Sequence, residues 1–263
     1  MRYAVALGRI LTWSLETHLV DHCNLRCREC CTNSPLLDPW FVDPALLEEE
    51  LRRAAEVLRP NLFKLTGGEP LLHPRLLECV EVARQSGIAS QISLTTNGLL
   101  LKKAPDGLFR LLDRLTVSWY SSAPLPVETV SWIETKCARH NVLLNLKPVT
   151  AFQQMTPENV PQSAAEAARV FSGCWMKERC HLLYRGRFFT CTRPPHLGAV
   201  HGIPLGETDG VRLSERGLLD RLIDSLERGE PLQSCQYCLG TAGPHEEHGQ
   251  LEPLPTASGG KGA

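Results

Sequence analysis

Four cysteines crowd one short loop near the start of the chain: Cys23, Cys27, Cys30 and Cys31. Thiolates bind zinc and iron–sulfur clusters, and they form disulfides only where the surroundings are oxidising. The C-x3-C-x2-C spacing lacks the paired fourth ligand of a structural zinc site, and adjacent residues rarely reach one metal centre. Three thiolates could instead hold three irons of a cubane cluster and leave the fourth iron open to a ligand.

More cysteines lie toward the C-terminal end, at positions 174, 180, 191, 235 and 238. A four-cysteine set that ends in C-x-x-C suits zinc as well as an iron–sulfur cluster, and spacing alone does not decide between them. Cys79 and Cys137 fall in helical stretches, where we expect core packing. The sequence His245-Glu-Glu-His248 lacks the H-E-x-x-H spacing of zinc proteases, and we expect a solvated turn there.

Composition and charge indicate the cellular compartment and the classes of partner that we expect for this protein. Of the 263 residues, 28 are Lys or Arg and 29 are Asp or Glu, a balance that argues against nucleic-acid binding driven by bulk charge. No apolar run has the length of a membrane span, and the N-terminal apolar stretch is too short for a signal peptide. We therefore expect a cytoplasmic protein with no nucleic-acid or membrane partner, whose cysteines serve metal rather than disulfides.

Strand-like runs alternate with helical patterns through the first 150 residues, which predicts an α/β fold with a parallel sheet or barrel. The predicted strands span 12–20, 61–66, 90–97, 114–121 and 141–149. The predicted helices between them span 43–59, 74–86, 107–113 and 126–139, and Asp43 and Pro44 favour a helix start. Beyond residue 171 we expect a hairpin that turns at Arg185-Gly186 and a helix over 214–228.

Several predicted strands carry polar side chains at alternate positions, which places them on one face of each strand. With helices on the other face, these side chains could line a lumen that holds a polar ligand; a one-sided sheet with a wet face is the alternative. A lysine in such a lumen needs an anionic partner. The stripe comprises Glu16, His18, Lys64, Thr66, Ser93, Thr95, Asn97, Ser118, Tyr120, Asn145 and Lys147.

Two motifs together carry a family resemblance. C-x3-C-x2-C follows the first predicted strand, and Gly67-Gly68-Glu69-Pro70 follows the second. This combination resembles the radical S-adenosylmethionine (radical SAM) superfamily. The resemblance implies a 4Fe–4S cluster on Cys23, Cys27 and Cys30, whose open iron chelates SAM. It also implies reductive cleavage of SAM to a 5′-deoxyadenosyl radical that abstracts a hydrogen atom from the substrate.

The resemblance further implies which residues contact SAM. In the family the GGEP motif contacts the SAM amino group; glycines allow close backbone approach, and a glutamate can pair with an ammonium. The family pattern usually has an aromatic residue before the third cysteine, where this chain has Glu29. The implied SAM-contact set is Gly67, Gly68, Glu69, Pro70, Thr95, Asn97, Ser118, Asn145 and Lys147.

The C-terminal cysteines resemble those of the twitch module, a shortened SPASM domain that binds one auxiliary 4Fe–4S cluster. The implied ligands are Cys174, Cys191, Cys235 and Cys238. Cys180 is left over, as a packed thiol, an alternative ligand or a hydrogen-atom donor. We expect a partial (β/α) TIM-like barrel of five to six parallel strands over 1–170, a small cluster-binding module over 171–248, and a disordered tail over 249–263.

The chain is similar to aminocyclitol and sugar dehydrogenases and epimerases of the superfamily. That similarity implies an oxidoreductase or epimerase acting on a carbinol carbon of a sugar or aminocyclitol, in natural-product or glycan biosynthesis. It also implies an electron donor such as flavodoxin or ferredoxin. The alternatives are a peptide-modifying maturase and a non-catalytic metalloprotein.

Overall fold

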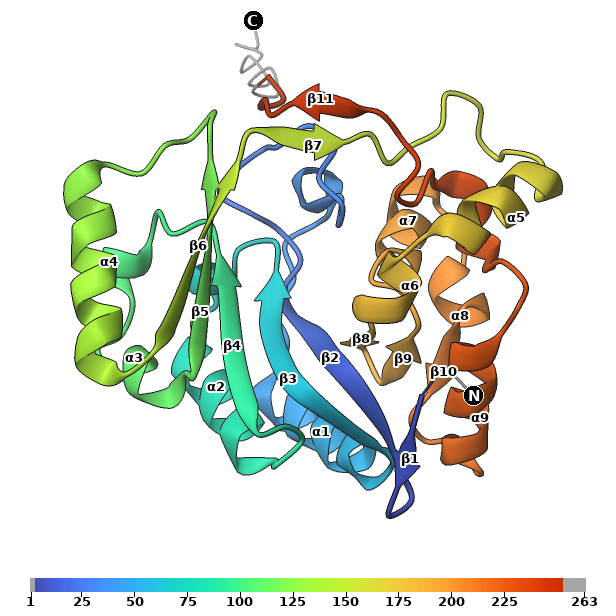
Figure 1. Ribbon diagram of the computed structural model, residues 1–263, viewed down its shortest axis with the longest axis horizontal. Helices are drawn as coiled ribbons and strands as arrows, with labels where there is room; N and C mark the ends of the chain where they lie inside the picture. The colour runs from blue at the N-terminus through green and yellow to red at the C-terminus, as the bar shows by residue number, and fades with distance from the viewer. Residues whose placement is uncertain (1–2, 253–263) are drawn as a thin grey trace, which may run out of the picture.

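The computed structural model describes residues 3–252, and nine strands in this part form one sheet (Figure 1). The strand order is β10-β9-β8-β2-β3-β4-β5-β6, and β1 pairs with the start of β2. The strands are β1 (Val5–Ala6), β2 (Arg9–Val20), β3 (Leu58–Gly67), β4 (Gln91–Thr96), β5 (Arg114–Tyr120), β6 (Leu143–Val149), β8 (Leu182–Tyr184), β9 (Arg187–Phe189) and β10 (Gly210–Arg212).

The strands from β2 to β6 run parallel to one another, and β8 runs parallel to β2 on its other side. Parallel neighbours need a crossover, and helices supply it after β2, β3, β4 and β5. These helices are α1 (Pro44–Val57), α2 (Leu76–Gln85), α3 (Leu108–Leu111) and α4 (Val127–His140). They lie on one side of the sheet in Figure 1, so the predicted α/β partial barrel is confirmed.

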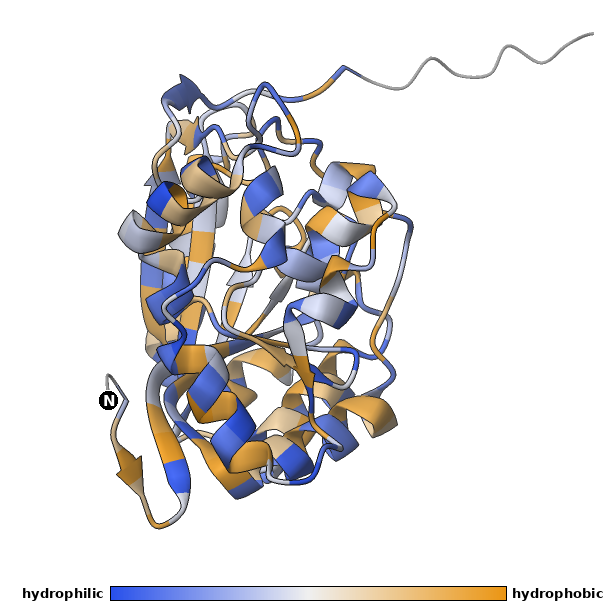
Figure 2. Cartoon of the chain, turned by 90° about the vertical axis from the view of Figure 1, so that its right-hand side faces the viewer, coloured by the Kyte–Doolittle hydropathy of each residue, from blue (hydrophilic) through white to orange (hydrophobic). Residues whose placement is uncertain are grey.

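One hydrophobic core lies between the sheet and these helices. Leu65, Leu94 and Leu115 point from three strands into it and have no exposed surface. The amphipathic helices turn apolar residues toward the sheet and polar residues outward (Figure 2). Cys79 and Cys137 are 0% and 2% exposed within this core, which confirms their predicted packing role.

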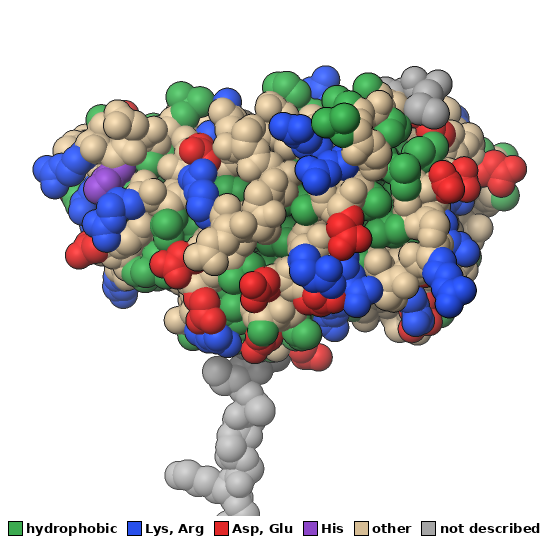
Figure 3. Space-filling view, turned by 90° about the horizontal axis from the view of Figure 1, so that it is seen from below, with side chains coloured by type: hydrophobic (Ala, Val, Ile, Leu, Met, Phe, Trp, Pro, Cys, Tyr) green, Lys and Arg blue, Asp and Glu red, His purple; other side chains and the backbone are tan. Residues whose placement is uncertain are grey.

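The outer faces of these helices carry mixed charge. In the face shown in Figure 3, basic and acidic side chains are interspersed. On α1, Arg52 and Arg53 both pair with Glu49, at 2.9 and 2.6 Å. The Asp43 side chain caps α1 by accepting from the backbone N–H of Ala45, and Pro44 occupies the first helical position, as predicted.

The C-terminal part continues the same sheet beyond β2. Strands β8 and β9 form the predicted hairpin, and Arg185 and Gly186 take the positive φ angles of its turn, 49° and 74°. The predicted helix over 214–228 is α9 (Leu218–Glu227). Four further helices have no counterpart among the predicted elements: α5 (Ala164–Gly173), α6 (Met176–Arg179), α7 (Pro194–His201) and α8 (Leu205–Thr208).

A two-stranded ribbon crosses the end of the sheet above β5 and β6 (Figure 1). It pairs β7 (Ala151–Gln153) with β11 (His245–Glu247), so 245–247 form a strand and not the predicted turn, although all three residues are exposed as predicted. His248 is 4% exposed because it stacks on Tyr120, with ring centroids 4.6 Å apart, so the predicted exposure of this residue is wrong.

The predicted disordered tail does not begin at 249. Gln250 forms a β-bridge with Cys27 and donates from its side-chain amide to the Ser122 hydroxyl. The remainder of that predicted tail, 253–263, lies outside the described residues. Between residues 3 and 252, no helix has the length and apolar character needed to cross a membrane.

The buried sheet face makes one stability prediction. Leu94→Ala should lower the free energy of unfolding by about 2–5 kcal/mol, because it leaves a cavity in a core with little room to collapse. Val127→Ala, at a position 76% exposed, is the matched control and should change it by about 0.5 kcal/mol at most. Anaerobic urea unfolding measures both, and equal effects would contradict this description of the core.

Candidate functional site

A cavity of about 790 Å³ lies over the polar faces of strands β2 to β6. Its size is within the range of pockets that hold small molecules. Every member of the predicted polar stripe lines it except Ser93, which is buried away from the wall. The predicted lumen is therefore present in the structure.

The cysteine loop forms one wall of this cavity. Cys23, Cys27 and Cys30 all line it, and none is in a disulfide. Amide N–H groups point at two of the sulfurs: Leu25 N lies 3.4 Å from Cys23 Sγ, and Gln250 Nε2 lies 3.5 Å from Cys27 Sγ. Donors of this kind stabilise thiolates, as iron–sulfur ligation requires.

Two observations test whether these thiols fit a cluster. Burial raises the pKa of Cys23 to about 12 and that of Cys27 to about 11, so their thiolates need a bound cation. Across residues 3–252, no three cysteine sulfurs lie within 4.8 Å of one another, the closeness that a single tetrahedral ion demands. The three thiols fit a multi-iron cluster better than one zinc ion.

The glycines of the GGEP loop allow two backbone segments to meet. A Cβ on Gly67 would collide with the carbonyl oxygen of Val20, and one on Gly68 with that of His22. In their place the Gly68 N–H donates to Val20 O at 2.7 Å, and the Glu69 N–H donates to His22 O at 3.1 Å. The close approach made possible by these glycines is thus to the start of the cysteine loop.

Glu69 is fully buried and does not line the cavity. Its carboxylate accepts from Thr96 Oγ1 at 2.6 Å, from Asn97 N at 2.8 Å and from Leu71 N at 3.0 Å. Burial raises the pKa of Glu69 to about 7, although these hydrogen bonds lower it. In this structure Glu69 ties the loop to the end of β4, and its pairing with an ammonium stays a prediction.

The other implied SAM contacts fall into two groups, those that line the cavity and those that do not. Pro70 is buried at the start of the short 3-10 helix η2 (Pro70–Leu72) and is not part of the cavity wall. Those that do line the cavity are Gly67, Gly68, Thr95, Asn97, Ser118, Asn145 and Lys147.

The two lysines of the cavity wall differ in their partners. Lys64 forms an ion pair with Glu16 at 2.9 Å. Burial would lower the pKa of Lys64, but the Glu16 carboxylate holds it above its usual value. Lys147 has no ion pair within the described residues. It is therefore the lysine of the wall that is available to a ligand carboxylate.

Cys180 lines the same cavity. Burial raises its pKa to about 12, and Glu16 raises it further, so the group is a thiol at neutral pH. Cys31 also lines the cavity, and its side chain is solvent-exposed. Only a protonated sulfur can deliver a hydrogen atom, so the geometry permits the predicted donor role of Cys180.

The four predicted auxiliary ligands come together at a second, smaller cavity. Cys174, Cys191, Cys235 and Cys238 all line it, and Cys180 does not. The Gly240 N–H donates to Cys238 Sγ at 3.1 Å. Chain segments more than 40 residues apart thus supply one group of thiols. Since no three of these sulfurs lie within 4.8 Å of one another, their spacing also fits a multi-iron cluster better than one zinc ion.

The side chain of Arg193 tests whether an anionic metal centre fits this second cavity. Arg193 is among the residues that line the cavity, is 1% exposed, and has no hydrogen-bond partner for any of its three guanidinium nitrogens among residues 3–252. A buried unpaired cation is very costly. Four thiolates around a cluster or a zinc ion carry net negative charge and would balance it. The sequence analysis missed Arg193, whose only signal is its position two residues after Cys191.

Glu29 also gains a role that the sequence did not indicate. It adopts a positive φ of 54°, and its carboxylate accepts from Met155 N at 2.8 Å. This contact joins the cysteine loop to the segment after β7. The contact spans 126 positions, so no local pattern could reveal it.

Comparison with known proteins identifies the barrel. Residues 18–142 match the family model of the Radical SAM superfamily. GTP 3′,8-cyclase from Streptomyces coelicolor is 34% identical over 159 residues, which cover 58% of this chain and 45% of that protein. GTP 3′,8-cyclase from Crocosphaera subtropica is 35% identical over 121 residues, which cover 44% and 36%. The chain thus spans less than half the length of these curated relatives.

A solved structure extends the likeness beyond the barrel. The crystal structure of BtrN in complex with AdoMet and 2-DOIA matches with a TM-score of 0.50 over 84% of each chain. Its sequence identity is 16%, so this match supports the fold alone. The cysteine loop, the GGEP loop and the family match together place residues 18–142 in the radical SAM superfamily.

Proposed function

We propose that this chain is a radical SAM oxidoreductase or epimerase that acts on a carbinol carbon of a sugar or aminocyclitol. One observation carries the proposal: a single cavity is lined by the three-cysteine loop, by neutral hydrogen-bonding side chains and by the protonated thiol of Cys180. We propose a 4Fe–4S cluster on Cys23, Cys27 and Cys30, and an auxiliary one on the second cysteine set. A flavodoxin or ferredoxin would supply the electrons.

When bound, the first cluster supplies the electron that splits SAM, and the auxiliary cluster offers a second redox centre. The chain's own residues bind and orient. Lys147 is placed to pair with a carboxylate, and the backbone of Gly67 and Gly68 lines the same wall. Thr95, Ser118 and Asn145 offer hydroxyl and amide groups to the substrate and to the ribose of SAM.

Two outcomes are open to the substrate after it loses a hydrogen atom. In an epimerase, the Cys180 thiol returns a hydrogen atom to the opposite face of the carbon, and the flavodoxin or ferredoxin would supply the electron that, with a proton, restores the thiol from the thiyl radical. In a dehydrogenase, the substrate radical loses one electron, which the auxiliary cluster would accept, and one proton, for which His18 and Glu16 are the nearby acceptors on the wall. Cys180 lies in the cavity and outside the auxiliary set, which favours giving it a role toward substrate.

The cavity wall favours a hydroxyl-rich substrate over a nucleoside triphosphate such as the one in the names of the curated relatives. A triphosphate needs several cations, whereas the wall offers Lys147 and a Lys64 already paired with Glu16. Neutral hydrogen-bonding groups discriminate among hydroxyls, because an unpaired buried donor costs about 1–3 kcal/mol. Peptide modification remains the alternative.

Loss of one ligand should abolish the first step. Cys27→Ala should eliminate formation of 5′-deoxyadenosine, because two thiolates cannot hold the SAM-binding cluster. Cys137→Ala, at a cysteine packed in the core, is the control and should retain it. Anaerobic assays with SAM and dithionite measure the product by mass spectrometry, and cleavage retained by Cys27→Ala would refute the assignment.

Loss of one auxiliary ligand should lower the iron content without preventing SAM cleavage. Cys238→Ala should lose about half of the iron per chain and still form 5′-deoxyadenosine, because its thiol lines only the second cavity. Iron and sulfide analysis after anaerobic reconstitution gives the first quantity. Unchanged iron content would exclude Cys238 as a cluster ligand.

One isotope experiment distinguishes the substrate class and the reaction type. In deuterated water, a panel of sugars, aminocyclitols and short peptides is offered to the wild type and to Cys180→Ala. An epimerase gives a product of unchanged formula with one deuterium, and Cys180→Ala abolishes that label. A dehydrogenase gives a product lighter by two hydrogens in both proteins. Turnover of peptides alone would overturn the carbinol proposal.

A further inference from the structure

A cluster of three metal-binding side chains lies where the barrel meets the C-terminal part. His18 comes from β2, Asp21 follows the end of that strand, and His196 comes from α7. The three residues are 2%, 4% and 1% exposed. One nitrogen or oxygen atom of each lies within 4.8 Å of those of the other two. The cluster is thus buried, compact and built from both parts of the chain.

Each of these side chains has an unsatisfied polar atom. His18 Nδ1, Asp21 Oδ1 and His196 Nε2 have no hydrogen-bond partner among residues 3–252. Buried polar atoms are nearly always paired, and a single orphan is already costly. Three orphans in one cluster therefore indicate a shared partner that all three atoms can reach.

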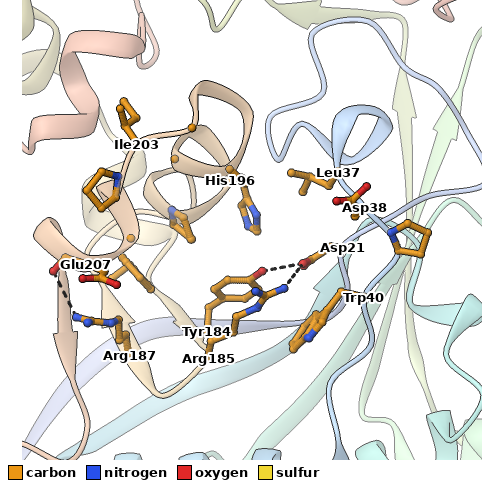
Figure 4. Close-up of a pocket in the computed structure, with 18 residues that line it drawn as sticks. Asp21, Leu37, Asp38, Trp40, Tyr184, Arg185, Arg187, His196, Ile203 and Glu207 are labelled. Atoms are coloured by element: carbon orange, nitrogen blue, oxygen red, sulfur yellow. Dashed lines mark hydrogen bonds and ion pairs between the residues drawn. The ribbon is translucent and has the colours of Figure 1, made fainter.

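Two of these side chains are held by contacts of their other polar atom, and for His18 this is Nε2, which lies 3.5 Å from Thr192 Oγ1. Asp21 Oδ2 accepts from Tyr184 Oη at 2.7 Å and from Arg185 Nη2 at 3.1 Å, as Figure 4 shows. The rings of His18 and His196 lie 4.4 Å apart and nearly parallel. Metal ligands are commonly oriented by such outer hydrogen bonds, which leave the coordinating atom free.

The charged groups around the cluster are one carboxylate and two arginines. Burial lowers the pKa of both His18 and His196, so both imidazoles are in the neutral, ligating form at pH 7. Arg185 forms an ion pair with Asp21, and the charges of Arg193 and Arg185 also lower the pKa of His196. Asp21 is the one anionic side chain of the three, so the binding of a cation depends on it.

We propose that His18, Asp21 and His196 bind one divalent transition-metal ion of the zinc class. Two imidazoles and one carboxylate suit Zn²⁺ and also Fe²⁺, Co²⁺ and Mn²⁺, and three protein ligands leave room for water. The ion would join β2 of the radical SAM barrel to α7 of the C-terminal part. The site uses none of the cysteines, and it shares His18 with the wall of the first cavity.

The test adds Zn²⁺ to the full-length protein after anaerobic reconstitution and mild chelation. We expect one tightly bound zinc per chain, with nitrogen and oxygen neighbours at about 2.0–2.1 Å in zinc-edge X-ray absorption. Zinc bound through sulfur, at about 2.3 Å, would place the ion on the cysteines and overturn the proposal. Failure of the wild type to retain zinc would also overturn it. Neither readout depends on SAM cleavage.

Variants separate ligation from folding. Asp21→Asn keeps the shape but removes the anionic ligand, and zinc affinity should fall about 100-fold or more. Tyr184→Phe removes only an outer hydrogen bond and should cost about 10- to 100-fold. His201→Ala, on the same helix α7, is the control and should leave zinc affinity unchanged. Iron content and thermal unfolding verify that each variant is folded, and equal zinc affinity in all of them would refute the site.

Discussion

The backbone contact between the GGEP loop and the start of the cysteine loop is the constraint on which the site depends. Gly67 and Gly68 lie directly against Val20 and His22, with no space for a Cβ at either glycine. The hydrogen bonds across this contact hold the end of β3 against the residue before Cys23. The three thiols therefore project from a rigid edge of the sheet. A cluster needs its ligands held in place, because ordering a free loop on binding would cost affinity.

The cavity beside this edge has charged groups that are already paired and neutral polar groups that remain open to a ligand. Glu16 and Lys64 neutralise each other on the wall, and Glu69 is satisfied by backbone and hydroxyl donors behind it. The other side chains that face the cavity are largely neutral, apart from Lys147 and Glu29. Such a wall selects a ligand by hydrogen-bond pattern rather than by net charge, which is why a small polyol suits it.

The C-terminal part is joined to the barrel through the sheet and through buried polar groups. Strand β8 pairs with β2, so the hairpin that leads to Cys191 extends the same hydrogen-bonded ladder. At this junction lie the unpaired guanidinium of Arg193 and the orphaned atoms of the His18, Asp21 and His196 cluster. Buried groups of this kind are tolerated only when something balances them. The two unsatisfied sets have opposite requirements, an anion for the first and a cation for the second.

The sequence by itself determined the elements and the local motifs, because these depend on short-range chemistry. Period-two polarity indicated the lumen, Asp43 and Pro44 marked a helix start, and the spacing of Cys23, Cys27 and Cys30 indicated the cluster site. Only the tertiary structure decided what depends on contacts between distant segments. It showed that Glu69 faces inward, that Arg193 faces the second cysteine set, and that His196 meets His18. Burial removes a group's access to water, and no local pattern tells which group will be buried beside which partner.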